Sequence, residues 1–199
     1  MGTEKLDTEV RREQIAQAML ILLGTRGFRG LSMAQVAHHV GIVPSAIYRH
    51  FKNKDAILDA VIDLIGDRLL GNVQTVCGET SVPVERLKRL LMRHAGFIRE
   101  NKAIPFIIFS EDVYFRKPKR KARIEGVLRK FLDRVADIIR EGQEQGQIRS
   151  DIDPGTLSVM FVGLFQPAAI LWHMSEGRFN VTRHVERAWK VFSDAIAKR

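Results

Sequence analysis

Cysteine is almost absent from this sequence, and its scarcity removes two classes of site. Cys77 is the only cysteine in 199 residues, so the chain forms no intramolecular disulfide and no metal site built on several cysteines. The N-terminus also lacks the apolar run of a signal peptide. A reducing cytoplasm is the natural setting for such a chain, and we expect a cytoplasmic protein.

Long apolar runs are missing as well. The most apolar stretch, residues 157–172, is shorter than the roughly 20 residues that span a bilayer, and Gln166 and Pro167 interrupt it. The stretch is apolar almost all round, which predicts a helix that is covered on several sides. We therefore expect a buried helix and no membrane partner.

The sequence carries no signature of catalysis that we recognise: no nucleophile elbow, no glycine-rich phosphate loop and no convincing set of metal ligands. His38 and His39 are adjacent, so on a helix they point about 100° apart, and surface histidines are favoured over zinc ligands. We predict no enzyme, no cofactor and no metal. The alternative is a helical enzyme or lipid carrier whose basic surface faces a membrane or a cofactor.

Strand-like alternation of any length is absent, whereas helical spacing recurs along the chain. The predicted fold class is therefore all-α. Glycines in the segment 24–30 are expected to end the first helix. Further stripes predict a helix over residues 124–138 and another over residues 184–197.

Residues 26–54 contain no carboxylate. Within them Ser32 and Gln35 fit a capping box at the start of a helix. Gly41 is suited to left-handed backbone that ends this helix, and Pro44 is suited to the first turn of the next one. Apolar positions on both sides of Gly41 predict two short helices packed across a tight turn, a helix-turn-helix.

The second short helix is expected to point polar side chains outward, where they reach phosphates or base edges. A segment without carboxylates does not repel a phosphate backbone, and the chain carries a formal net charge of +9, which favours polyanionic partners. The spacing of the motif therefore favours DNA binding over a helical hairpin inside a generic bundle.

The segment 15–58 resembles the N-terminal DNA-binding domain of TetR-type transcriptional regulators. The matching residues are Ile15, Ala18, Gly27, Phe28, Ser32, Val36, Ala37, Gly41, Ile47, Tyr48, Phe51, Lys54 and Leu58. Val43 departs from the Ser or Thr that usually precedes the recognition helix. The resemblance implies a three-helix DNA-binding domain in residues 1–54, followed by a larger helical bundle for ligand binding and dimerisation in residues 55–199.

With this resemblance, we expect a transcriptional regulator, specifically a repressor that binds a pseudo-palindromic double-stranded operator as a homodimer and is released by a small apolar ligand. An architectural DNA binder without a ligand would leave the large helical C-terminal region unexplained. The expected DNA-binding residues are Ser32, Pro44, Ser45, Ala46, Tyr48, Arg49, His50 and Lys54. Tyr48 and Lys54 are expected to hold phosphates, and Arg49 with its neighbours in the helix to face base edges.

Large side chains are frequent in the C-terminal region, and each one taken alone is favoured as core. Together they suit the apolar ligand cavity of similar proteins. The expected ligand-binding residues are Met92, His94, Phe97, Phe106, Phe109, Tyr114, Phe161, Phe165, Gln166 and Trp172.

Two further features have open interpretations. The basic run 116–123 suits a second DNA contact, the rim of a site for an anionic ligand or, by default, a solvated loop that enters a helix. The TetR resemblance implies that the helices around 157–172 and 184–197 pair with their symmetry mates in a dimer, which is favoured over two helices that fill a monomeric core because such motifs normally read DNA as dimers. A charge at Leu164 or Phe192 is then expected to produce monomers.

Overall fold

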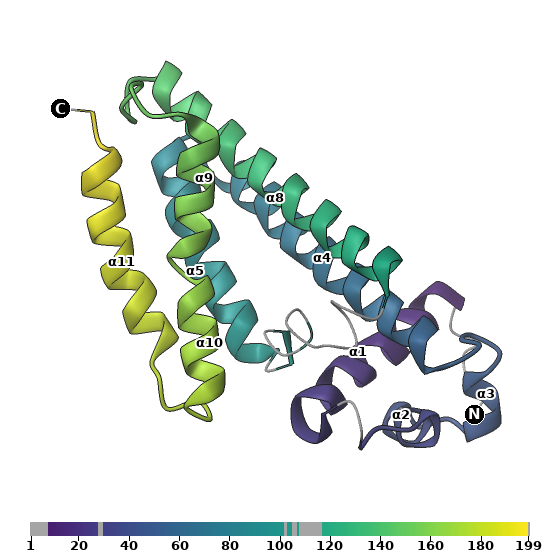
Figure 1. The fold of residues 1–199 in the computed structure, drawn as a ribbon. Coiled ribbons are helices and arrows are strands. Elements are labelled where there is room, and N and C mark those ends of the chain that lie inside the picture. Colours follow the sequence, from purple (N-terminus) through teal and green to yellow (C-terminus); the bar gives the residue numbers. More distant parts are fainter. Residues whose placement is uncertain (1–7, 28–29, 102, 105–106, 108–116, 199) are drawn as a thin grey trace. The chain divides into compact units, whose positions relative to one another are not determined.

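The computed structural model describes residues 8–27, 30–101, 103–104, 107 and 117–198 (Figure 1). Its named elements are all helices, so the all-α prediction is confirmed. They are α1 (Thr8–Arg26), α2 (Met33–Val40), α3 (Pro44–Ile47), α4 (Lys54–Glu79), α5 (Pro83–Glu100), α8 (Pro118–Glu144), α9 (Pro154–Gly163), α10 (Gln166–Met174) and α11 (Val181–Ile196).

The chain forms two compact units, and the first combines residues 1–67 with residues 101–120. In this unit α2 packs against both α1 and α3. Its core is apolar and includes Ile15, Met19, Val36, Ile47, Phe51 and Ile57, all at most 2% exposed. The helix α1 continues through Gly24 and ends at Arg26, where Gly27 takes a φ of 64°. Of the glycines expected to end this helix, Gly27 supplies the left-handed turn.

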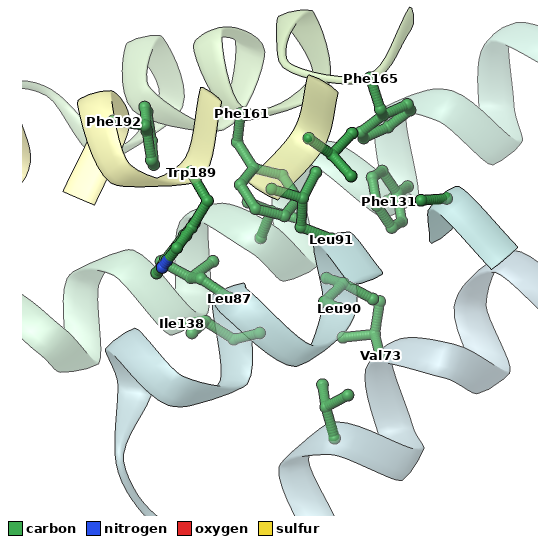
Figure 2. Close-up of a cluster of buried hydrophobic side chains, with 14 of the residues drawn as sticks. Val73, Leu87, Leu90, Leu91, Phe131, Ile138, Phe161, Phe165, Trp189 and Phe192 are labelled. Atoms are coloured by element: carbon green, nitrogen blue, oxygen red, sulfur yellow. The ribbon is translucent and has the colours of Figure 1, made fainter. Parts of the chain in front are cut away.

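The second unit contains residues 68–100 and 121–199 and has a large core of its own. Figure 2 shows aliphatic and aromatic side chains from α4, α5, α8, α9 and α11 meeting in this core. Phe131 from α8 and Phe161 from α9 are at most 1% exposed, and Trp189 from α11 is 7% exposed. Most of the expected apolar stripe of α11 therefore faces this core, and so does the part of the α8 stripe from Phe131 to Ile138, whereas Leu128 of α8 is 44% exposed.

The apolar segment predicted as a single helix over 157–172 forms two helices, α9 and α10, which are interrupted at Leu164 and Phe165. From Pro154 to Met174 it spans 21 residues with a mean hydropathy of 1.5, so by length and composition it could cross a membrane. This length exceeds the sequence-based expectation because α9 begins at Pro154, ahead of the apolar run, and α10 continues to Met174. Phe161, Phe165 and Trp172 nevertheless pack into the core of the second unit.

Candidate nucleic-acid interface and candidate ligand site

The start of α2 carries the expected capping box. The backbone N–H of Gln35 donates to Oγ of Ser32 at 3.3 Å, and the backbone N–H of Ser32 donates to Oε1 of Gln35 at 2.8 Å. These two bonds satisfy amides that the first turn of a helix otherwise leaves without partners. The prediction that Ser32 and Gln35 begin this helix is confirmed, while a contact of Ser32 with DNA stays a prediction.

The turn between α2 and α3 is set by Gly41, which has a φ of 77° and donates its N–H to the carbonyl of His38 at 3.1 Å. The next amide, that of Ile42, donates to the carbonyl of Ala37 at 3.0 Å. A residue with a Cβ is strained in this region of backbone space, so glycine is the residue that allows the sharp turn. Val43, which stands in place of the usual Ser or Thr, supplies no side-chain cap, and Pro44 occupies the first turn of α3 as predicted.

The helix α3 is shorter than the sequence suggested, because it ends at Ile47 and residues 48–50 form turns. Tyr48 is 58% exposed, whereas Ile47 and Phe51 on either side of the turns are buried. The buried pair anchors the segment and leaves the side chains between them near the surface. Pro44, Ser45 and Arg49 are also exposed, and Ala46 and Lys54 are half-buried.

His50 differs from the other predicted DNA-binding residues. It is half-buried, and its Nδ1 is buried without a hydrogen-bond partner among the described residues. Its backbone carbonyl accepts a hydrogen bond from Arg12 of α1, a residue that sequence reasoning did not single out. No short-range pattern could have indicated this contact, because the two residues are 38 positions apart.

The default interpretation of the basic run 116–123 is a solvated loop that enters a helix, and in the described part the helix α8 already begins at Pro118, with residues 117–119 and 121–123 exposed. Arg120 is 4% exposed and donates to Oδ1 of Asp59 at 2.7 Å and to Oδ1 of Asp55 at 3.3 Å. Lys117 donates to the other carboxylate oxygen of Asp55 at 3.2 Å. Partial burial acts to raise the pKa of Asp55, but its bonds to Lys117 and Arg120 outweigh this effect and lower it.

These ion pairs matter for the candidate interface because Asp55 is the first carboxylate after the acid-free segment 26–54. A carboxylate that is held by two cations repels a phosphate less than an unpaired one. Lys117 and Arg120 of the basic run therefore pair with carboxylates in the first turns of α4 and do not form a separate basic surface.

The aromatic residues predicted to bind a ligand are largely packed into the core of the second unit. Phe161 is fully buried, and Phe165 and Trp172 are at most 8% exposed. The ring centroids of Phe161 and Phe165 lie 6.3 Å apart. Met92 packs against the same core, and Gln166 is half-buried. Three further predicted residues, Phe106, Phe109 and Tyr114, lie outside the described residues.

His94 is the polar member of this aromatic group. Its ring centroid lies 3.8 Å from that of Phe165, 6.0 Å from that of Phe131 and 6.4 Å from that of Phe97. Its Nδ1 is buried without a partner among the described residues, and burial lowers the pKa of His94 to about 3. The imidazole is therefore neutral at neutral pH, with a buried polar nitrogen beside phenylalanine rings.

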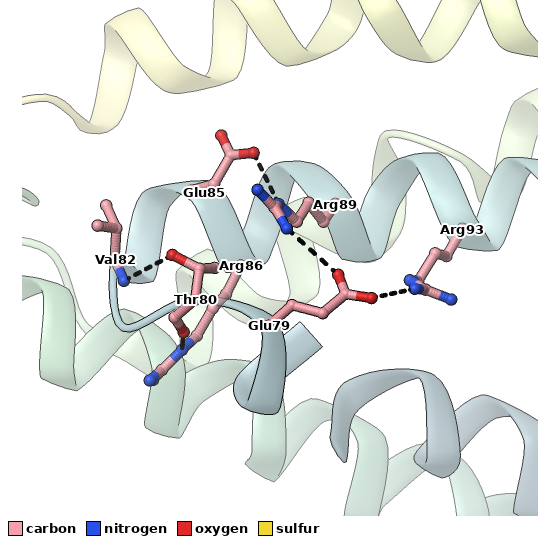
Figure 3. Close-up of polar contacts among 7 residues, drawn as sticks. All are labelled: Glu79, Thr80, Val82, Glu85, Arg86, Arg89 and Arg93. Atoms are coloured by element: carbon pink, nitrogen blue, oxygen red, sulfur yellow. Dashed lines mark hydrogen bonds and ion pairs between the residues drawn. The ribbon is translucent and has the colours of Figure 1, made fainter. Parts of the chain in front are cut away.

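A groove of about 710 Å³ between α4 and α5 is polar rather than apolar. Its lining residues are Arg68, Gly71, Asn72, Gln74, Thr75, Arg93, Gly96, Phe97 and Glu100. Of the predicted ligand-binding residues, only Phe97 lies there. Figure 3 shows that Glu79, at the end of α4, is paired with both Arg93 and Arg89. The Glu79–Arg89 distance is 3.4 Å. The predicted apolar site and this groove are therefore different places.

The proposed dimer helices carry both buried and exposed apolar side chains. Phe192 is 4% exposed, and its ring lies 6.1 Å from that of Phe161 and 6.2 Å from that of Trp189. A charge at Phe192 is thus expected to disrupt the core of one subunit. The expectation that such a charge specifically produces monomers therefore does not hold for Phe192. The exposed large apolar residues of α9, α10 and α11 are Val159, Met160, Ile170, Leu171, Met174 and Val191, at 37% to 74% exposure.

Comparison with known families assigns both parts of the chain. Residues 15–61 match the family model described as bacterial regulatory proteins of the tetR family. Residues 80–196, more than half of the chain, match the model described as the tetracyclin repressor-like C-terminal domain. The chain belongs to the TetR family. The TetR resemblance predicted from residues 15–58 is confirmed.

Relatives and structural neighbours agree with this TetR assignment. The nucleoid occlusion factor SlmA of Yersinia enterocolitica is 25% identical over 183 residues, which cover 90% of this chain and 91% of that protein. The fatty acid degradation regulator FadR of Bacillus halodurans has a TM-score of 0.80 at 19% identity, with 99% of this chain and 100% of that chain covered. A TetR/AcrR-family regulator of Thermobifida fusca has a TM-score of 0.71 at 24% identity, with coverages of 93% and 97%.

Membership of the TetR family makes this protein a DNA-binding transcriptional regulator with a helix-turn-helix. Its family members and structural neighbours are regulators rather than enzymes. Homodimers and ligand binding are typical of the family.

Proposed function

We propose that this TetR-family protein is a cytoplasmic repressor that binds a pseudo-palindromic operator as a homodimer and is released by a small apolar ligand. The observation that carries the proposal is the exposed face of residues 44–49, which lies in a segment without carboxylates and is anchored by buried Ile47 and Phe51. Exposed hydroxyl, phenol and guanidinium groups on such a face suit contacts to phosphates and base edges.

The exposed apolar residues of α9 to α11 support the dimer. Met160 on α9 and Ile170 and Met174 on α10 are each more than a third exposed, and Ile170 and Met174 are four positions apart, on one face of α10. Exposed apolar side chains of this kind are favourable when a partner covers them. Two-fold pairing also matches a pseudo-palindromic operator, since each subunit then meets one half-site.

The group around His94 supports an apolar ligand. The Nδ1 of His94 has no hydrogen-bond partner in the described part of the chain and lies among Phe97, Phe131 and Phe165, so it offers a ligand one directional hydrogen bond in apolar surroundings. A FadR of Bacillus subtilis, with a TM-score of 0.77 at 17% identity and coverages of 92% and 98%, was solved in complex with stearoyl-CoA. A largely aliphatic ligand is therefore a reasonable first choice. Lys117 and Arg120 already pair with carboxylates, which weakens the idea that they attract an anionic end of the ligand.

Selection of bound duplexes from a random DNA pool tests the proposal. We expect enriched sequences with two related half-sites whose centres lie about 34 to 36 Å apart, or a multiple of one helical turn. Calorimetry with an acyl-CoA series, run with and without the selected operator, then tests release. Linkage requires that operator DNA and ligand weaken each other's binding by the same factor. Enrichment of no sequence would refute the operator, and equal ligand affinity in both titrations would refute the release mechanism.

Tyr48 and Lys54 are expected to contribute affinity without sequence preference. Tyr48→Phe removes one hydroxyl, and we expect about a five-fold loss on every operator variant, as for a hydrogen bond of about 1 kcal/mol. Lys54→Ala should also make the negative slope of log K against log salt shallower by about 0.9, as expected when one phosphate contact is lost. Binding titrations at four salt concentrations measure both effects. Losses that differ between operator sequences would contradict phosphate contacts.

Arg49 is expected to read a base. A bidentate arginine pairing discriminates between bases by about 1 to 3 kcal/mol, so Arg49→Ala should flatten the preference at one position in each half-site. The measurement is a repeat of the random-pool selection with the variant. Lys52→Ala is the matched control, because Lys52 is exposed and lies beyond the buried Phe51. An unchanged preference profile with lower affinity would make Arg49 a phosphate contact instead.

The SlmA relatives favour a second candidate function, in which the protein acts in nucleoid occlusion. These relatives are 22% to 25% identical over at least 90% of this chain. A genome-wide map of bound sites separates the two candidates. Sites confined to the control regions of a few genes would favour the repressor, and sites spread over much of the chromosome would favour nucleoid occlusion.

A further inference from the structure

The segment after α3 has little support from its own backbone. The helix has four residues, and three further hydrogen bonds continue it as turns. These run from Arg49 N–H to the Ala46 carbonyl at 3.2 Å, and from the N–H groups of His50 and Phe51 to the Ile47 carbonyl at 3.0 Å each. A helix of this length is not stable by itself in water, so its geometry depends on tertiary contacts.

Arg12 of α1 supplies two such contacts at the end of the segment. Its Nη1 donates to the backbone carbonyl of His50, and its Cζ lies 4.2 Å from the centroid of the Phe51 ring. Phe51 is 2% exposed, so the ring that Arg12 covers is fixed in the core of the first unit. Arg12 is half-buried, and its guanidinium contacts this segment through one in-plane N–H group and through its face.

The chemistry of arginine suits this position. The last carbonyls of a helical segment lack intrahelical partners and carry partial negative charge, so a cationic donor there is favourable. A guanidinium can donate in its plane while its face stacks on an aromatic ring, which an ammonium does less well. One side chain thereby connects α1, the carbonyl of His50 and the buried ring of Phe51.

We infer that Arg12 is a positioning residue for DNA recognition: it fixes the turn that follows α3, so that Tyr48 and Arg49 keep their orientation, and it does not itself contact DNA. The inference rests on the proposed role of residues 44–50 in binding the operator. It differs from a phosphate contact in two measurable ways, which are the salt dependence of binding and the order of the segment without DNA.

The first test compares Arg12→Met with Arg11→Met. Both variants lose one positive charge at adjacent positions, but among the described residues the hydrogen bond of the Arg11 side chain stays within its own helix, from Nη1 to Oε1 of Gln14 at 2.9 Å. We expect Arg12→Met to bind the selected operator on the order of ten-fold more weakly, as when a charge-assisted hydrogen bond is lost. The salt slope should stay as in the wild type. Arg11→Met should retain affinity within about two-fold, since among the described residues the Arg11 side chain bonds to Gln14 of its own helix and not to the segment after α3.

If the negative slope of log K against log salt becomes shallower by about 0.9 in Arg12→Met, Arg12 contacts a phosphate and the inference is overturned. An affinity equal to that of the wild type would overturn it as well. If Arg12→Met does not fold, Arg12→Lys carries the test, because it keeps the charge and a donor but loses the planar face. We expect Arg12→Lys to bind with intermediate affinity and an unchanged salt slope. A shallower salt slope would again overturn the inference.

The second test needs no DNA. Amide hydrogen exchange of residues 49–51 should be faster in Arg12→Met than in the wild type, while exchange in Ile57–Ile62 of α4 stays unchanged. Equal exchange at residues 49–51 would refute a positioning role. Should the wild type select no operator at all, the proposed function fails, and the exchange measurement still decides whether Arg12 orders this segment.

Discussion

Leu171→Glu is expected to yield folded monomers that bind the operator at least 100-fold more weakly than the wild type. Leu171 is 46% exposed on α10, so a charge there leaves the core of the subunit intact. In a dimer the same charge would be buried without a partner, which is strongly unfavourable. A monomer then loses the gain of about 100-fold to 10,000-fold that comes from engaging two half-sites together.

Sedimentation at micromolar concentration and operator titration measure the two effects of Leu171→Glu. Leu128→Glu is the matched control, because Leu128 is 44% exposed but lies on α8, outside the proposed dimer surface. The control should remain dimeric and bind normally. A dimeric Leu171→Glu protein, or a monomeric wild type at the same concentration, would contradict the proposed interface.

His94 is expected to make the protein markedly less stable in mild acid. Its pKa in the folded protein is lowered from 6.5 to about 3 by burial, so below pH 6.5 the unfolded chain binds a proton that the folded chain does not. Each pH unit below 6.5 then costs about 1.4 kcal/mol of the free energy of unfolding from this group alone, until the pH approaches 3. Above pH 6.5 the imidazole is neutral in both states, and this contribution vanishes.

The variant His94→Phe isolates this effect. Phenylalanine suits the neighbouring rings of Phe131 and Phe165 and carries no titratable group. Denaturant unfolding from pH 7 to pH 4.5 should therefore show the variant gaining stability over the wild type as the pH falls. The difference between the two proteins cancels the contributions of the other titratable groups. A difference that does not depend on pH would contradict the burial of an uncharged His94.

Several features of the candidate interface were accessible to sequence reasoning because they depend on near neighbours. The capping box joins Ser32 and Gln35, three residues apart, and its two hydrogen bonds are formed. Gly41 was predictable because glycine enters left-handed backbone without the steric cost of a Cβ. The end of α3 at Ile47 was not predicted, since four residues give too short a pattern to reveal where a helix stops.

The C-terminal region shows the limit of the same reasoning. Its apolar residues were recognised, but the sequence does not show whether a residue of the apolar stripe such as Phe192, which is 4% exposed, packs into the core of its own subunit or against a partner. Which side of an apolar helix is covered depends on the helices that pack against it. The core position of Phe161 and Phe165 likewise follows from the packing of α5, α8, α9 and α11.

The sequence by itself therefore determined the all-α class, the helix-turn-helix and the TetR resemblance, because caps, turns and apolar spacing act over a few residues. Only the tertiary structure decided the partners of Arg12 and Arg120. Arg12 reaches the carbonyl of His50 across 38 positions, and Arg120 reaches Asp59 across 61 positions. Such pairs are set by the way helices pack, and a guanidinium has similar chemistry wherever it stands in the sequence. Packing alone places it beside the carbonyl or carboxylate that gives it a role.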